Sequence, residues 1–341
     1  MTLLSLLYMS RTISSSPLPF AALILIASSF SAIVPVPPLA RIGRQYSSEF
    51  RPAELPSATQ NLIKSNVSLV KVFVTVLDKN HEVLADLEEN DFKIFENSRE
   101  QKIAVFSKRA KNPITAALLV DTSLSERYLF GVVQEAASGF VHKVLNDGDE
   151  AMAMSFDSKA NVFADFTENF TGLDRLIHQT AVKPPVGRAG TVFYDAVYLA
   201  CRQLIDEAGK KLLVVFTDAY DTGSRMNLRD DVAEAQRTNA TIYIFLIADP
   251  RFSSGYGFGS RGEVVAKIMT SETGGRTIEI RKRANLAEGL DELSEEIRSQ
   301  YVVGYYPTNA KPGGRFRKIR IKTDVQGTTV LARRGYYAPA D

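Results

Sequence analysis

Between residues 114 and 300 short apolar runs alternate with amphipathic stretches, and this alternation restricts the fold more than any other feature. The apolar runs are ITAALLV (114–120), EAMAMSF (150–156), KKLLVVFTD (210–218) and TIYIFLI (241–247), each about as long as a strand buried on both faces. Stretches of helical periodicity, such as 126–145 and 191–209, lie between them. Strands that alternate with helices predict an α/β fold, with a doubly wound, mostly parallel sheet of the Rossmann-like kind.

Shorter segments of alternating polarity flank this region on both sides. They are 67–78, 91–97 and 101–107 before it, and 301–307, 316–323 and 328–337 after it. This alternation is typical of antiparallel strands, but either group alone has too few strands to be stable. We therefore predict a small antiparallel β domain made of residues 61–110 and 297–341, with the α/β domain of residues 111–296 inserted in it or flanked by it. Two separate β appendages are the alternative.

The first 60 residues read as a targeting segment and a linker. Arg11 precedes the apolar stretch 17–32, which ends in small residues and is too short to span a bilayer comfortably. We predict a signal peptide at 1–32, a proline-rich linker at 33–60, and a secreted, periplasmic or cell-envelope location. An uncleaved signal anchor is the alternative, and it is the only membrane contact that we expect. The single cysteine, Cys201, lies in a helical pattern and is expected in the core.

Composition excludes several function classes. The formal net charge is +2, from 41 basic and 39 acidic residues, which does not favour a nucleic-acid or polybasic membrane surface. The three histidines (His81, His142 and His178) lie far apart and lack metal-ligand spacing, so a histidine-based zinc site is not expected.

Oxygen-bearing side chains follow two of the predicted strands and precede one predicted helix. Asp121, Ser123 and Ser125 alternate after the first strand, Thr191 stands before a helix, and Asp218 ends a later strand. Ligands of a doubly wound sheet bind at the carboxyl ends of its strands, so we expect these five side chains to converge. Each also has a simpler interpretation as a helix cap or turn residue.

An all-oxygen set of two carboxylates and three hydroxyls favours a hard cation. Mg²⁺ takes six oxygen ligands and readily keeps waters, with Mn²⁺ or Ca²⁺ as alternatives. Only Asp121 and Asp218 would then carry charge, and one coordination position could accept a carboxylate from outside.

At these residues a resemblance to a known family emerges. DTSLS, the GT of AGTVFYDA and the TD of VVFTDAYD resemble the metal-ion-dependent adhesion site of von Willebrand factor type A (VWA) domains. The resemblance implies a metal site at Asp121, Ser123, Ser125, Thr191 and Asp218, and a protein partner that presents an Asp or Glu carboxylate. The flanking segments DFKIFENSREQKIAVFS and RSQYVVGYYPTN resemble the secreted VWFA-related proteins of acidobacteria.

Three functions remain to be weighed. Binding or adhesion through the metal is the main hypothesis, and a scaffold whose metal only stabilises it is the alternative. A Mg²⁺-dependent phosphohydrolase is less favoured, because Ser123 stands where a second catalytic aspartate would be needed and neither a G-x-S-x-G elbow nor a phosphate-binding loop occurs. The glycine-rich stretch 254–260 reads as a loop near the site. We therefore predict a protein that is not an enzyme.

Overall fold

The structure is a computed structural model that describes residues 68–340, except 109–111, 183–189, 248–257, 310 and 312. The side chains of residues 258–260 are not described either, so most of the glycine-rich stretch 254–260 is excluded. The predicted signal peptide, the linker and residues 61–67 lie outside the described residues. The described residues belong to one compact unit, Leu62–Asp341. Within them, no helix combines the length and apolar character needed to cross a membrane.

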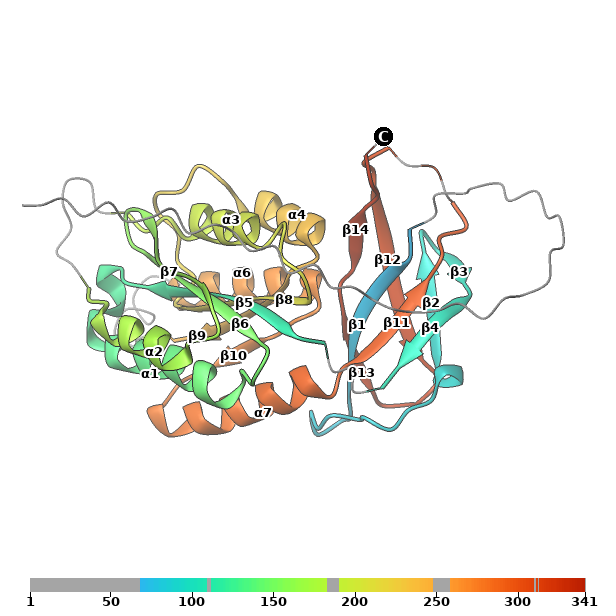
Figure 1. Cartoon of the computed structure of the whole chain (residues 1–341), viewed down its shortest axis with the longest axis horizontal. Helices are drawn as coiled ribbons and strands as arrows, with labels where there is room; N and C mark the ends of the chain where they lie inside the picture. Colours follow the sequence, from blue (N-terminus) through green and yellow to red (C-terminus); the bar gives the residue numbers. More distant parts are fainter. Residues whose placement is uncertain are drawn as a thin grey trace, which may run out of the picture. The chain divides into compact units, whose positions relative to one another are not determined.

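A six-stranded sheet forms the centre of the α/β region (Figure 1). Its strand order is β10-β9-β8-β5-β6-β7, and all neighbours are parallel except β6 and β7. The strands are β5 (Ile114–Asp121), β6 (Glu150–Phe156), β7 (Ala160–Thr167), β8 (Lys210–Thr217), β9 (Thr241–Leu246) and β10 (Thr277–Glu279). Every residue of β5 is buried, as its continuous apolar run predicts.

Helices cover both faces of this sheet. They are α1 (Phe130–Lys143), α2 (Phe170–Gln179), α3 (Phe193–Gln203), α4 (Leu228–Thr238), α6 (Phe258–Thr273) and α7 (Leu286–Arg298), with the short turns η2 (Leu124–Tyr128) and η3 (Arg283–Asn285). Successive side chains of β5 point to opposite faces, so Leu118 packs in one core with α1, α2 and α7. Leu119 packs in the other core, with α3, α4 and α6. Cys201 is buried in this second core, as predicted.

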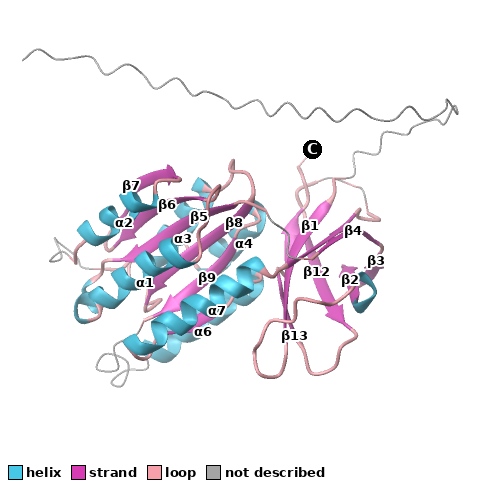
Figure 2. Cartoon of the chain, turned by 60° about the horizontal axis from the view of Figure 1, so that its bottom comes forward, coloured by secondary structure: helices cyan, strands magenta, loops and turns pink. Residues whose placement is uncertain are grey.

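Strands from the two flanks pair with one another in two antiparallel sheets. The sheet orders are β13-β1-β11-β4 and β14-β12-β2-β3. The strands are β1 (Val70–Leu77), β2 (Phe92–Glu96), β3 (Arg99–Gln101), β4 (Ile103–Ser107), β11 (Tyr301–Tyr305), β12 (Phe316–Thr323), β13 (Thr329–Ala332) and β14 (Gly335–Tyr337). Figure 2 shows this region as strands and loops with the short turn η1 (Glu89–Asp91). The predicted fold class, a mostly parallel α/β sheet with a small antiparallel β region, is confirmed. The exact domain limits stay a prediction.

Two elements begin or end elsewhere than the sequence pattern indicates. The helical periodicity of 126–145 starts too early, because η2 is a 3-10 turn and α1 begins only at Phe130. The segment 101–107 is interrupted at Lys102, so that β3 and β4 belong to different sheets. Both differences arise from local backbone geometry, which side-chain periodicity does not report.

Gly274 ends α6 with a backbone that only glycine adopts readily. Its φ is +89°, and a Cβ at this position would lie 2.5 Å from the backbone nitrogen of Arg333 and 2.7 Å from the carbonyl carbon of Ala332. The backbone N–H of Arg334 also donates to the carbonyl of Glu272, at 3.0 Å. The end of α6 therefore packs directly on the turn between β13 and β14.

We expect Gly274→Ala to lower the free energy of unfolding by roughly 2 kcal/mol or more, because it adds a backbone clash to the strain of a positive φ. Urea unfolding followed by circular dichroism measures the loss. Gly327→Ala is the matched control, since Gly327 has φ +74° but nothing lies within 4 Å of an added Cβ. If Gly274→Ala and Gly327→Ala lower the free energy of unfolding equally, the turn between β13 and β14 moves away from the added Cβ at no energetic cost.

Candidate metal site

The carboxyl ends of β5 and β8 meet where the strand order of the sheet reverses. From β5 the chain continues to β6 on one side, and later returns to β8 on the other side. Because β5 and β8 are parallel neighbours, their ends lie together at this switch point, where ligands bind in sheets of this kind. β5 ends at Asp121, and β8 ends at Thr217, directly before Asp218.

Asp121 is fully buried at the end of β5. One oxygen accepts a hydrogen bond from the backbone N–H of Ser123 at 2.9 Å, and the other accepts one from the Thr217 hydroxyl at 2.6 Å. Burial, together with the nearby charge of Asp218, raises the pKa of Asp121 to about 7. Hydrogen bonds from Ser123 and Thr217 oppose this rise. A cation beside Asp121 would favour its charged form.

The two serines of the D-x-S-x-S stretch lie side by side. The hydroxyl oxygens of Ser123 and Ser125 are 3.0 Å apart. Thr122, between Asp121 and Ser123, uses both its N–H and its hydroxyl to donate to the carbonyl of Phe156 on β6, at 2.8 and 3.0 Å. Thr122 therefore has a structural role, whereas the alternating residues Ser123 and Ser125 are available to a ligand.

Asp218 approaches the same point from β8. Burial raises the pKa of its carboxyl, against hydrogen bonds from the backbone N–H of Tyr220 and the hydroxyl of Ser125. The next residue, Ala219, has a φ of +57°, an unfavourable value for alanine, and its N–H donates to the Thr217 hydroxyl at 2.9 Å. Thr217 thus bridges Asp121 and the strained turn that carries Asp218.

Thr191 is attached to this turn by its backbone. Its N–H donates to the Thr222 hydroxyl at 2.7 Å, and its carbonyl accepts from the N–H groups of Thr222 and Gly223, both at 3.0 Å. In the described part of the chain, no hydrogen bond joins the Thr191 hydroxyl to the other predicted ligands. The structure therefore brings Asp121, Ser123, Ser125 and Asp218 together, and places Thr191 on a loop fixed to the one that follows Asp218.

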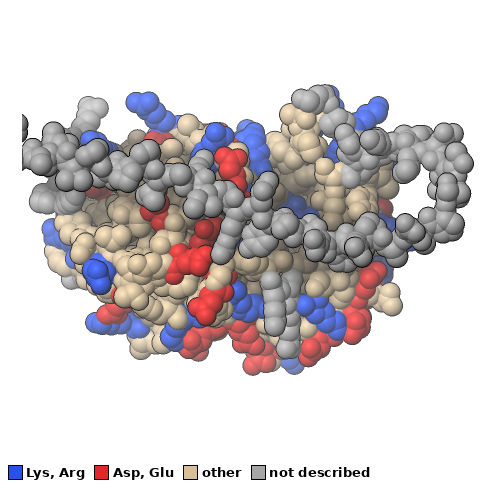
Figure 3. Space-filling view, in the orientation of Figure 1, with Lys and Arg blue, Asp and Glu red and all other residues tan. Residues whose placement is uncertain are grey.

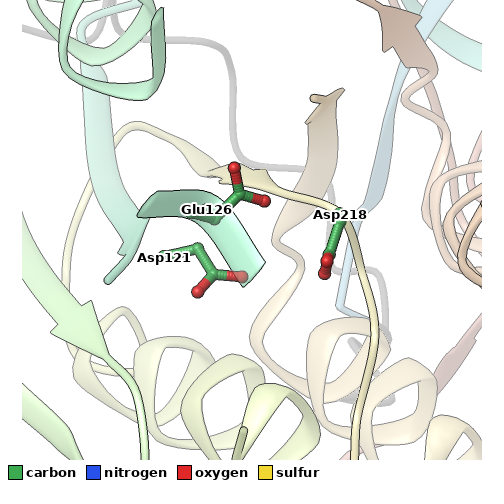
Figure 4. Close-up of side chains that lie close together, drawn as sticks. All are labelled: Asp121, Glu126 and Asp218. Atoms are coloured by element: carbon green, nitrogen blue, oxygen red, sulfur yellow. The ribbon is translucent and has the colours of Figure 1, made fainter. Parts of the chain in front are cut away.

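A third carboxylate, which the sequence analysis missed, completes the cluster. Glu126 is 2% exposed, and carboxylate oxygens of Asp121, Glu126 and Asp218 all lie within 4.8 Å of one another (Figure 4). The sequence analysis expected two carboxylates here, Asp121 and Asp218, and the structure places a third beside them. The available signal was its position directly after Ser125.

This donor set suits a hard divalent cation. It consists of carboxylates and hydroxyls, with the acidic groups held close together in a buried place where their charges repel. Asp121, Ser123, Ser125 and Asp218 could hold such an ion, and Glu126 lies within reach of it.

Part of the α/β region matches a known protein family. Residues 116–223 match the family model described as the von Willebrand factor type A domain. Comparison with curated proteins gave no match.

Solved structures with some likeness to the chain include three bacterial proteins. An aerotolerance-related membrane protein from Bacteroides fragilis is 15% identical, with 54% of this chain and 98% of that chain covered and a TM-score of 0.42. The pilus adhesin SpaC from Lactobacillus rhamnosus GG is 10% identical, over 75% of this chain and 48% of that chain, with a TM-score of 0.44. A von Willebrand factor type A protein from Catenulispora acidiphila is 12% identical, over 81% and 75%, with a TM-score of 0.43. The family match identifies residues 116–223 as a von Willebrand factor type A domain.

Proposed function

We propose that the chain is a secreted or cell-envelope binding protein. Its VWA domain would hold a divalent cation, Mg²⁺ in the first instance, and through it bind an acidic side chain of a protein partner. The observation that carries this proposal is the meeting of Asp121, Asp218 and the paired hydroxyls of Ser123 and Ser125 at the switch point of the sheet. The location rests on the N-terminal sequence alone.

Each of these residues would have a different role at such a site. Asp121 and Asp218 would supply negative charge, and Ser123 and Ser125 would supply neutral oxygens. Thr217, which donates to Asp121 at 2.6 Å, would hold that carboxylate in place from behind. Thr191 would contribute its hydroxyl from the loop fixed to Thr222. When bound, the cation supplies positive charge that an incoming carboxylate can coordinate.

We propose that the site binds rather than catalyses, and that its partner is a protein rather than a nucleic acid. On the face that Figure 3 shows, Lys and Arg side chains lie scattered among Asp and Glu instead of forming one basic patch. A distribution of this kind gives little general attraction to a polyanion.

Thermal unfolding of the chain in EDTA and then in excess Mg²⁺ tests the metal site. At about 100 times the dissociation constant, the ion should add roughly 2.7 kcal/mol to the wild type and little to Asp121→Ala. Asp121→Asn keeps the size of the side chain, so this second variant separates loss of metal binding from a general loss of folding. Asp165→Ala is the control, because Asp165 is an exposed carboxylate on β7 and should leave the Mg²⁺ effect intact.

Partner chemistry is tested with an array of acidic peptides and their Asn and Gln counterparts. Binding that requires Mg²⁺, the peptide carboxylate and Asp121 is expected. Metal-dependent stabilisation without any carboxylate-dependent peptide binding would favour the scaffold alternative instead.

A further inference from the structure

Glu126 is turned into the metal site by the backbone of η2. Its N–H donates to the carbonyl of Ser123 at 3.1 Å, and its own carbonyl accepts from the N–H of Leu129 at 2.8 Å. Leu124 and Tyr128 on the same turn are 45% and 51% exposed, whereas Glu126 is 2% exposed. The turn that presents Ser123 and Ser125 therefore also fixes the backbone position of Glu126 and directs its side chain inward.

The spacing of the three carboxylates fits a single ion. Two ligands on opposite sides of Mg²⁺ lie about 4.2 Å apart, and on opposite sides of Ca²⁺ about 5 Å, given their usual metal–oxygen distances. Oxygens of Asp121, Glu126 and Asp218 already lie within 4.8 Å of one another, so small side-chain shifts would bring all three onto one cation. Figure 4 shows Glu126 on its helical turn and Asp218 on the loop opposite, with Asp121 below Glu126 and to the left of Asp218.

We propose that Glu126 is a further ligand of the cation and fills, in the resting protein, the coordination position that a partner's carboxylate would take. The inference rests on the proposed function, because it needs a cation at Asp121 and Asp218. It concerns how the site is regulated, by a carboxylate of the chain itself.

The net charge at the cation determines how a partner's carboxylate would bind. Two carboxylates balance a divalent cation, whereas three leave the site with a net charge of −1, which repels an incoming carboxylate. A partner would therefore bind by exchange: one carboxylate leaves the ion as another arrives, and the charge at the metal is unchanged. The side chain of Glu126 would move out of the site, while Ser123 and Ser125 stay in place.

The test uses Mn²⁺ and acetate as probes on the whole chain. Calorimetric titration gives the Mn²⁺ affinity, and water-proton relaxation of the Mn²⁺-loaded protein reports how many waters the ion holds. Glu126→Gln should weaken Mn²⁺ binding by at least about tenfold. Glu126→Ala should show relaxation that corresponds to one additional bound water, and excess acetate should remove that water in this variant but not in the wild type.

Glu168→Gln serves as the matched control, since Glu168 is exposed and away from the cluster. Circular dichroism in EDTA checks that Glu126→Gln and Glu126→Ala are folded. If both keep wild-type Mn²⁺ affinity and relaxation while Asp121→Ala loses binding, Glu126 is not a ligand and the proposed site survives. If the wild type binds no Mn²⁺, the proposed function fails together with this inference.

Discussion

Glu96→Ala is expected to lower the free energy of unfolding by about 3–5 kcal/mol, because it breaks a buried ion pair. Glu96 is 3% exposed at the end of β2 and pairs with the guanidinium of Arg317 at 3.3 Å. It also accepts hydrogen bonds from the hydroxyls of Tyr305 and Tyr336, at 2.9 and 2.8 Å. All three partners come from the C-terminal flank, so this one carboxylate joins the two ends of the described chain.

The loss would come from groups that stay buried without their partner. Arg317 is 6% exposed, and among the described residues it would keep the carbonyls of Asn309 and Lys311 and the hydroxyl of Tyr336 as acceptors, with no carboxylate to balance its charge. Urea unfolding measures the effect by circular dichroism, since the chain has no tryptophan. Glu100→Ala, an exposed change on the neighbouring strand β3, should stay within about 0.5 kcal/mol of wild type. Equal behaviour of the two variants would mean that Glu96 does not hold the flanks together.

Residues of the candidate metal site could be predicted from the sequence where strand geometry alone positions them. β5 is a continuous apolar run, so its end was visible in the sequence, and parallel neighbours bring their carboxyl ends to one edge. Asp121 and Asp218 follow from this rule. Ser123 and Ser125 follow from their alternation with Thr122, whose hydroxyl indeed bonds to Phe156 instead.

Glu126 could not be predicted in the same way, because its direction depends on a local turn. The periodicity from residue 126 onward indicates a helix. A glutamate in the first turn of a helix would be exposed to solvent, and its negative charge would interact favourably with the helix dipole. The structure instead has η2 there, and α1 starts four residues later. The change of backbone turns Glu126 from a surface position into the third carboxylate of the site.

Asp231 carries the second large effect: Asp231→Asn is expected to stabilise the fold, increasingly so as pH rises. Asp231 is fully buried near the start of α4, and within the described residues neither of its carboxylate oxygens has a hydrogen-bond partner. Burial, followed by the charges of Asp230, Asp195 and Asp221, raises its pKa from 3.8 to about 9. The favourable helix dipole, worth about 0.3–1 kcal/mol for an anion there, is too small to offset burial.

The sign follows from proton binding. Between pH 4 and 9 the folded protein keeps a proton that the unfolded chain has lost, so the free energy of unfolding falls as pH rises. At pH 7 this costs the wild type roughly 4 kcal/mol, and Asp231→Asn, which is neutral and of equal size, does not carry that cost. Urea unfolding at several pH values in EDTA measures the difference, with the exposed Asp206→Asn as a control for net charge. If the free energies of unfolding of wild type and Asp231→Asn follow parallel lines with pH, the pKa of Asp231 is not raised by folding and the prediction fails.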